Sequence, residues 1–421
     1  MANNAKTNLV IDFNNMAFRA MFMCIYSPEY KVSTFDTQEE NNEFICKLVT
    51  DISYIVRMFK PDRTIIACDS NQAWRKDLFE DLPGEKYKGT REKDDKKNWT
   101  MIFDNLGELK EALDKYGFFV NDVPRAEADD LAALWKEKCM REGDNLILIS
   151  SDKDWLQLAD FNPNFNNYCS IFNPIPNQKT RIKTMYGTQG FVDWLNKSES
   201  GNDIFFTNYD PHKDFLKKLL TSDRFINYNV IDPMETLMGK IMCGDDGDNV
   251  PSFYQFYKNA TKVRVTPNRA KKIEDLANAH NVTELVEAAS NGKLLEAMNS
   301  VLKYNVDVDM TQRLQRQRLF VELNSALFPE SIVTVFNKQM KRDVDKGFIV
   351  PDNCKVNTIL DGTKFLEHID RTRGTRIASI FSDLKEIDFI LDDLKEDKAS
   401  KKIKKGGFDF TQSENISDQL F

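Results

Sequence analysis

Short apolar runs alternate with amphipathic stretches along the N-terminal third of the chain. Three of these runs, at 8–11, 64–68 and 146–149, consist mainly of β-branched and aliphatic residues and are bounded by polar ones. Runs of this length and composition are typical of strands that are buried on both faces of a parallel sheet. Since amphipathic stretches separate the runs, we predict an α/β fold with a central, mostly parallel sheet and helices on both of its faces.

The predicted elements follow one another in regular alternation. We expect strands that end at Asp12, Asp69 and Ser151, with a short strand over 118–121. Amphipathic periodicity predicts helices over about 42–59, 101–116 and 127–141. Such alternation of strand and helix is the pattern of a parallel sheet whose connections cross over its faces.

Shifts in composition divide the chain into regions. We predict an α/β core over 1–230, a helical subdomain over 231–329, a C-terminal extension over 330–395 and a flexible tail over 396–421. Within the core, a charged segment at about 71–100 interrupts the alternation, which is more typical of a functional loop than of a plain connection. Residues 161–230 show no clear periodicity, and 376–394 show helical periodicity.

Composition narrows the class of protein. The chain has 421 residues, a net charge of −8 and 41% hydrophobic residues, which is ordinary for a soluble protein. No apolar run approaches the roughly 18 residues of a membrane span, and no signal peptide is evident, so we expect a cytoplasmic protein with no membrane partner. The 7 cysteines form no C-x-x-C pair, which favours reduced thiols over disulfides or zinc.

Carboxylates follow the predicted strands at the points where each strand ends. Because the carboxyl ends of parallel strands line one crevice, Asp12, Asp69 and Asp152 should meet at one rim of the sheet. Further acids lie at 127–130, 154 and 245–248. Carboxylates held close together repel one another unless cations lie among them. This set therefore predicts two hard divalent cations, Mg²⁺ or Mn²⁺, in one cleft.

The acids at 127–130 have two explanations. Glu127 and Asp130 lie three residues apart and share a helix face, whereas Asp129 points the same way only if the helix begins near it. Acids in a first helical turn are also favoured by the helix dipole. The helix dipole explains why acids occur at the start of this helix, but it does not explain why further acids follow the ends of the neighbouring strands.

Four motifs together resemble those of the flap endonuclease superfamily of 5′ nucleases. The segment at 149–158 resembles its S-x-D-x-D-x-x-Q-L motif, 126–133 its E-A-D-D helix start, 244–251 its G-D-x-x-D-N-[IV]-P turn and 87–91 its Y-K-x-x-R segment. They occur in the family's order and cover roughly residues 8–275. Among the members, the phage ribonuclease H branch, a 5′ to 3′ exonuclease and flap endonuclease, looks nearest.

The resemblance implies roles for particular residues. It implies a first metal held by Asp12, Asp69, Glu127, Asp129, Asp130 and Asp152, and a second held by Asp154, Asp245 and Asp248. It implies that Lys88 and Arg91 lie in an arch or gateway over the site, where their charge would stabilise the scissile phosphate. DNA-binding residues would be Arg75, Lys76, Tyr87, Arg264, Arg269, Lys271 and Lys272. Tyr87, and less surely Trp74, would stack on a terminal base, although Trp74 is equally consistent with the core.

One motif departs from the family. The glycine-rich hairpin that usually follows the G-D-x-x-D-N turn is replaced by an aromatic run at 253–257, which puts a monovalent ion there in doubt. The stretch 258–272 carries six cations and no acid, so the helix start at 266–272 remains able to hold phosphate, although a solvated surface is the plain alternative.

The resemblance and the acids together predict a structure-specific 5′ nuclease. It would hydrolyse DNA, and RNA primers on DNA, at 5′ ends, flaps or forks, as a monomer in phage-type replication within the bacterial host's cytoplasm. The alternatives are a single-strand ribonuclease with a related PIN-type sheet and a non-catalytic accessory protein that binds DNA junctions. The end of the tail, 418–421, is either a binding peptide for a sliding clamp or single-strand-binding protein, or an end without function. The histidines 212, 280 and 368 lie at no ligand or triad spacing, and no phosphate-binding G-x-x-x-x-G-K-[ST] pattern is present.

Overall fold

The computed structural model describes most of the chain before residue 346. The described residues are 5–26, 30, 32–79, 86–89, 96–115, 118–177, 179–180, 182–196, 211–221, 226–258, 261–306 and 308–345. Arg91, the helical periodicity at 376–394 and the tail at 396–421 lie outside them.

The described strands form one large sheet and one hairpin. The large sheet has the order β3-β2-β1-β4-β6-β7-β8, with β5 paired to β6. Its strands are β1 (Thr7–Asp12), β2 (Arg63–Cys68), β3 (Phe119–Asp122), β4 (Asn145–Ile149), β5 (Asp160–Asn162), β6 (Asn167–Asn173), β7 (Lys183–Gly187) and β8 (Ile226–Val230). The strands from β3 to β6 along this order are parallel, and β7 runs antiparallel to β6. The predicted fold class is confirmed.

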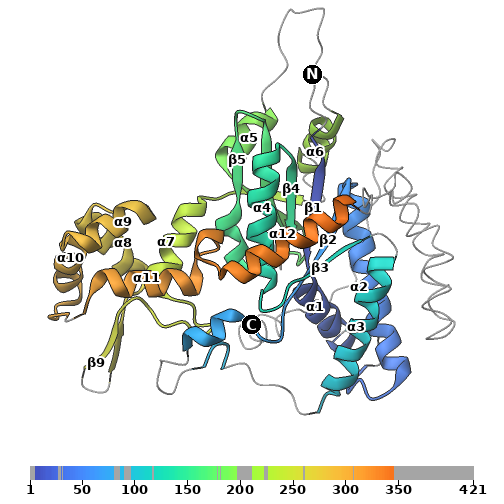
Figure 1. Cartoon of the computed structure of the whole chain (residues 1–421), viewed down its shortest axis with the longest axis horizontal. Coiled ribbons are helices and arrows are strands. Elements are labelled where there is room, and N and C mark those ends of the chain that lie inside the picture. Colours follow the sequence, from blue (N-terminus) through green and yellow to red (C-terminus); the bar gives the residue numbers. More distant parts are fainter. Residues whose placement is uncertain are drawn as a thin grey trace, which may run out of the picture.

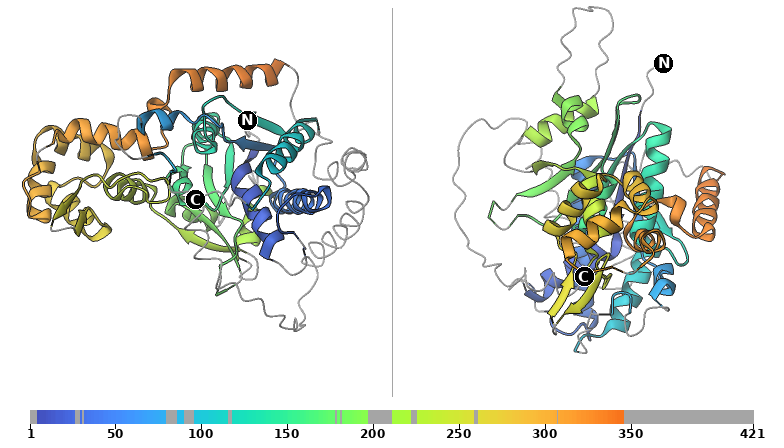
Figure 2. Two further views of the ribbon diagram at one scale, coloured as in Figure 1. Left: turned by 90° about the horizontal axis from the view of Figure 1, so that it is seen from below. Right: turned by 90° about the vertical axis from the view of Figure 1, so that its left-hand side faces the viewer.

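Helices cover both faces of this sheet (Figure 1). The core helices are α1 (Phe13–Tyr26), α2 (Gln38–Phe59), η1 (Trp74–Phe79), α3 (Trp99–Lys115), α4 (Ala128–Glu142), η2 (Lys153–Leu158), α5 (Gln189–Asn196), α6 (Pro211–Thr221) and α12 (Glu330–Asp345). The sheet lies between α12 on one side and α1 and α2 on the other, as the left view of Figure 2 shows.

Alternation along β1 assigns its side chains to two separate cores. Leu9 and Ile11 pack with residues of α1, α2 and α3, whereas Val10 packs on the opposite face with residues of α4 and α12. This follows because successive side chains of a strand point to opposite faces. All three side chains are fully buried, so both faces of the sheet exclude water.

A helical region extends from one side of the core (Figure 1). It contains α7 (Pro233–Cys243), the hairpin β9 (Gln255–Lys258) and β10 (Thr261–Arg264), α8 (Pro267–Ala277), α9 (Val282–Ser290), α10 (Lys293–Leu302), α11 (Met310–Val321) and η3 (Ser325–Leu327). Its apolar core also includes Ala73, Phe79 and Tyr87 from the segment between β2 and α3. The charged segment between β2 and α3 therefore packs against the helical region.

The start of the expected C-terminal extension belongs with the core. Ile332 and Phe336 of α12 are buried in the cluster that covers α4, and the Phe336 ring lies 5.8 Å from that of Trp135. Over the described residues, we find no helix with the length and apolarity needed to cross a membrane.

Candidate active site

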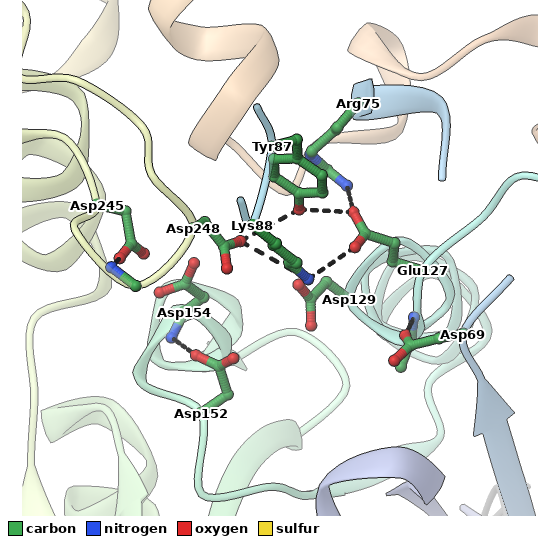
Figure 3. A network of polar contacts seen from close by, with 12 residues as sticks. Asp69, Arg75, Tyr87, Lys88, Glu127, Asp129, Asp152, Asp154, Asp245 and Asp248 are labelled. Carbon is green, nitrogen blue, oxygen red and sulfur yellow. Dashed lines mark hydrogen bonds and ion pairs between the residues drawn. The ribbon is translucent and has the colours of Figure 1, made fainter. Parts of the chain in front are cut away.

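Three acids lie where parallel strands end, as the sequence predicts. Asp12 is the last residue of β1, Asp69 directly follows β2, and Asp152 caps the N-terminus of η2 just beyond β4. Since β1 pairs with both β2 and β4, these strand ends are neighbours at one edge of the sheet. Figure 3 shows Asp69 on one side of the polar network and Asp152, Asp154, Asp245 and Asp248 on the other, with Glu127 and Asp129 between them.

Asp12 and Asp69 each accept hydrogen bonds from neighbouring residues. Asp12 accepts hydrogen bonds from the Asn15 N–H at 3.0 Å and the Ser150 hydroxyl at 2.9 Å. Asp69 accepts from the Asn14 side-chain amide at 2.8 Å and the Ala128 N–H at 2.7 Å. Burial, reinforced by the charge of Asp69, nevertheless raises the pKa of Asp12 to about 8. The pKa of Asp69 is also raised, mainly by burial.

Glu127 is contacted by two cations, Lys88 and Arg75. It is the N-cap of α4, and its carboxylate accepts from Lys88 Nζ at 2.7 Å, the Tyr87 hydroxyl at 2.8 Å and Arg75 Nη1 at 3.2 Å. Burial alone would raise the pKa of Glu127, but Lys88 and Arg75 outweigh it and hold the pKa at about 2. Glu127 therefore remains ionised.

Asp129 and Asp154 both lie near Asp152, whose charge repels each of them. The Trp155 indole donates to Asp129 at 2.5 Å, and the Asp154 N–H donates to Asp152 at 2.8 Å. Burial, followed by the charge of Asp152, raises the pKa of both Asp129 and Asp154 well above the usual value. The position of Asp129 is possible because α4 begins at Ala128, the condition set by the sequence analysis.

The turn before β9 places Asp245 and Asp248 on the side of the acid cluster opposite Asp69. Lys240, in the last turn of α7, forms ion pairs with both Asp154 and Asp245. Burial would raise the pKa of Asp245, but Lys240 lowers it overall. Lys240 thus joins an acid of the core to an acid of the helical region.

Lys88 makes a similar bridge from the charged segment at 71–100, which is expected to form the gateway. Its ammonium lies 2.7 Å from Glu127 and 3.8 Å from Asp248, and its backbone N–H donates to the Asp248 carbonyl at 3.1 Å (Figure 3). The Tyr87 hydroxyl also joins Glu127 to Asp248, at 2.8 and 3.1 Å. Both ion pairs are largely shielded from water, so they fix the gateway more firmly than exposed pairs would.

The carboxylates of the site are suitable ligands for hard cations, but several of them form ion pairs with lysines of the protein. Mg²⁺ prefers oxygen ligands, and these acids are carboxylates. Their pKa values are raised by burial and then by the charge of a neighbouring aspartate, which a cation would offset. Among the described residues, however, no three Asp, Glu, His or Cys side chains converge as a metal site requires. Lys88 and Lys240 lie between the acids instead. Divalent ions therefore fit the chemistry of the donors only if these lysines withdraw.

Some residues expected at the site surface lie in the interior. Asp130 is fully buried, where it accepts from the Trp74 indole at 3.0 Å and pairs with Arg75 at 2.8 Å. Arg75 is only 2% exposed, so its charge is directed at Asp130 and Glu127 rather than at DNA. The Tyr87 ring is buried beside Phe79, 5.4 Å away, which leaves no face for a base. Burial thus directs these three side chains to partners within the protein, while their expected roles in metal binding and DNA binding stay predictions.

The expected DNA-binding cations of the helical region are not drawn into the acidic cleft. Arg264, at the end of β10, pairs at 2.8 Å with Asp246 of the turn before β9, and Arg269 donates to the Arg264 carbonyl at 2.7 Å. Lys271 and Lys272 are exposed on α8, whose N-cap is Thr266. Lys76 donates to the Asn71 carbonyl at 2.7 Å. Arg91 lies outside the described residues.

Four residues that the sequence patterns did not predict organise the acids. Lys240, Asn14, Asn15 and Ser150 all contact candidate ligands directly. Asn14, Asn15 and Ser150 follow the ends of β1 and β4, so their positions in the sequence indicate that they lie near the acids at the same strand ends. Lys240 precedes Asp245 by five residues in an ordinary amphipathic helix, and only the fold reveals its second partner, Asp154.

Comparison with known proteins gives a consistent result. Residues 7–191 match the family model described as 5′-3′ exonuclease, N-terminal resolvase-like domain. A 5′-3′ exonuclease of Mycoplasmopsis pulmonis is 21% identical over 347 residues, which are 81% of this chain and 93% of that protein. Flap endonuclease Xni of Shewanella sediminis is 29% identical over 154 residues, 36% of this chain and 55% of that protein. A solved structure of T5 5′-exonuclease with divalent metal ions (zinc) covers 81% of this chain and 99% of its own at 19% identity, with a TM-score of 0.47.

Proposed function

We propose that this protein is a structure-specific 5′ nuclease, because residues 7–191 match the model of the N-terminal resolvase-like domain of 5′-3′ exonucleases. Its substrates would be DNA, and RNA primers on DNA, with a 5′ end, flap or fork, and it would act as a monomer. Its role would be primer removal in phage-type replication in the host cytoplasm. The relatives named as 5′-3′ exonuclease and flap endonuclease support the activity.

One observation carries the proposal. Acids from distant stretches of the chain gather at the carboxyl edge of the sheet, and Lys88 of the gateway reaches them from above. The surrounding hydrogen bonds do not offset the cost of ionising these acids, because the pKa of Asp12, Asp129 and Asp154 remains raised. A cluster of this kind is costly to folding unless cations complete it.

We assign the cations as two Mg²⁺ or Mn²⁺ ions. Asp12, Asp69, Glu127, Asp129 and Asp152 would hold the first, and Asp154, Asp245 and Asp248 the second. Ions held there would neutralise charge on the scissile phosphate and on the leaving oxygen. Asp130, which the sequence placed among the ligands, would instead position Glu127, since it accepts from the Glu127 N–H at 2.9 Å.

The protein's own cations would act on the phosphate. When ions take the acids, Lys88 would leave Glu127 and turn its ammonium towards the scissile phosphate, where negative charge develops. Lys240 would be released from Asp154 in the same way. The basic start of α8, with Arg269, Lys271 and Lys272, would hold the duplex backbone. Arg91 is proposed to act beside Lys88.

Two alternatives remain testable. A PIN-type ribonuclease should lack a helical second region, and α7–α11 therefore favour the nuclease that acts on duplex junctions. A comparison of 5′-flap DNA with unstructured RNA as substrates separates these two functions. A non-catalytic accessory protein would bind flap DNA but show no turnover in Mn²⁺.

The tail at 408–421 would recruit a sliding clamp or a single-strand-binding protein, or it has no function. Deletion of these residues distinguishes the two. Recruitment predicts loss of clamp-stimulated cleavage with unchanged basal cleavage, whereas unchanged stimulation would exclude a clamp contact.

A further inference from the structure

A second group of cations lies on α1, α2 and β7, apart from the acidic cleft. Arg19 of α1 and Lys47 of α2 both pair with Asp51, with an Arg19–Asp51 distance of 2.9 Å. Lys183, the first residue of β7, lies near the same group and interacts electrostatically with all three. Arg19 and Lys47 thus share the carboxylate of Asp51, with Lys183 nearby, and the side chains of Arg19, Lys47 and Asp51 are each less than one-fifth exposed.

Lys183 has an environment that is unusual for a lysine. Its ammonium lies 4.1 Å from the centre of the Tyr54 ring and 6.0 Å from that of Phe172. Within the described part of the chain, the structure gives it these two rings and no ion pair. Burial, followed by repulsion from Arg19, lowers the pKa of Lys183 to about 8. The aromatic rings therefore compensate its charge only in part.

The group of cations lies near the edge of the sheet that carries the acids. Thr184 pairs with Asn173, the last residue of β6, so the start of β7 lies at the edge where the parallel strands end. This is the edge that carries Asp12 and Asp152. Arg19 also lies on α1, the helix that directly follows Asp12.

We propose that Arg19, Lys47 and Lys183 form an additional phosphate-binding site, separate from the cleft and from the basic start of α8. An ammonium and a guanidinium that are partly shielded from water bind a phosphate more strongly than exposed cations do. The anion would also relieve the repulsion that Asp51 alone does not balance. The ligand is a phosphate group of the substrate strand, which rests on the proposed function, or a free phosphate, and the two are distinguished below.

The first experiment uses inorganic phosphate and needs no nuclease activity. Thermal unfolding of the full chain is followed with and without phosphate, with sodium chloride at matched ionic strength. We expect phosphate to raise the melting temperature of wild type and of Lys60→Met, and to have no such effect on Lys183→Met. Lys60 is the matched control, because its ammonium also lies over a ring, Phe215 at 5.8 Å, but at the C-cap of α2. Equal shifts in all three proteins would overturn the site.

The second experiment asks whether the phosphate belongs to DNA. Binding of 5′-flap DNA is measured by anisotropy in Ca²⁺ over a series of salt concentrations. Loss of one phosphate contact should reduce the slope of log affinity against log salt by about 0.7 to 0.9 in Lys183→Met, with no change in Lys60→Met. Flaps with a 5′-phosphate and a 5′-hydroxyl show whether the contact is terminal or internal.

These results remain distinct from failure of the proposed nuclease. An unchanged slope together with a lost phosphate effect would assign the site to free phosphate and overturn the DNA contact. Lys183→Met that only melts at a lower temperature, with both binding measurements unchanged, would show that Lys183 merely packs against Tyr54. Absence of cleavage by wild type would overturn the nuclease without affecting the phosphate measurement.

Discussion

Lys88 and Glu127 form an ion pair of 2.7 Å that joins the charged segment expected to form the gateway, at 71–100, to the N-terminus of α4. The pair places a cation of this segment between two acids of the site, because Lys88 also lies 3.8 Å from Asp248. It also explains why Glu127 remains ionised, since Lys88 is the strongest influence that opposes burial in setting its pKa. The gateway and the acids therefore form one electrostatic unit.

Replacement of Lys88 tests its role at the phosphate. We expect Lys88→Met to lower the rate of 5′-flap cleavage by about 10²- to 10³-fold, the usual cost of one preorganised donor. Flap binding in Ca²⁺ should change much less. The control is Lys86→Met, an exposed neighbour in the same segment. Similar rates for the two variants would exclude a role for Lys88 in catalysis.

Removal of an acid tests the assignment of the ions. Titration calorimetry of wild type with Mg²⁺ or Mn²⁺ should show two sites, and Asp154→Asn should weaken one of them at least 10-fold. Asp104→Asn, an exposed acid of α3, serves as the control. If Asp154→Asn bound both ions as wild type does, the second site would have to be assigned elsewhere.

The buried Arg75–Asp130 pair should contribute to stability rather than to DNA binding. Arg75→Met leaves Asp130 without its cation, so we expect the free energy of unfolding in urea to fall by about 3 to 5 kcal/mol. Addition of Asp130→Asn should recover part of this loss. A variant that kept its stability but lost affinity for flap DNA would restore Arg75 to the DNA-binding set.

The raised pKa values predict how stability depends on pH without divalent ions. Asp12, Asp129 and Asp154 keep their protons in the folded protein at pH values where the unfolded chain has lost them. The free energy of unfolding in EDTA should therefore fall as the pH rises from about 4 to about 8. Glu127, with a pKa of about 2, acts oppositely, but only below about pH 4.5.

Two changes should remove this dependence. Asp12→Asn should flatten the decline in stability, and Mg²⁺ at pH 8 should raise the melting temperature, because ligands that bind only the folded state stabilise it. Melting temperatures over the pH series, with and without Mg²⁺, provide the measurement. Stability that rose steadily towards pH 8 in EDTA would contradict the burial of these acids.

The sequence predicted the elements whose patterns are local. Strands β1, β2 and β4 are plain apolar runs, so they and the acids that follow them could be found directly. Strand β6 could not, because polar residues such as Asn167 and Ser170 are fully buried in it. Helix α1 has almost no polar stripe, so no amphipathic period marks it.

Partners across the fold were the least predictable part of the site. Arg75 and Tyr87 read as surface residues within a charged segment, yet Asp130 and Glu127 draw them inside. The bridge by Lys240 depends on the packing of α7 against η2, which no local pattern contains. The sequence therefore predicted which acids gather at the strand ends, but it did not predict which cations pair with them.

Cleavage of a labelled 5′-flap DNA by wild type and by Asp152→Asn tests the central claim most directly. We expect wild type to cut at the flap junction in Mg²⁺ and to be inactive in EDTA, and Asp152→Asn to bind the flap but cut it at least 100-fold more slowly. Cleavage by Asp152→Asn at the wild-type rate, or by wild type in EDTA, would contradict the account.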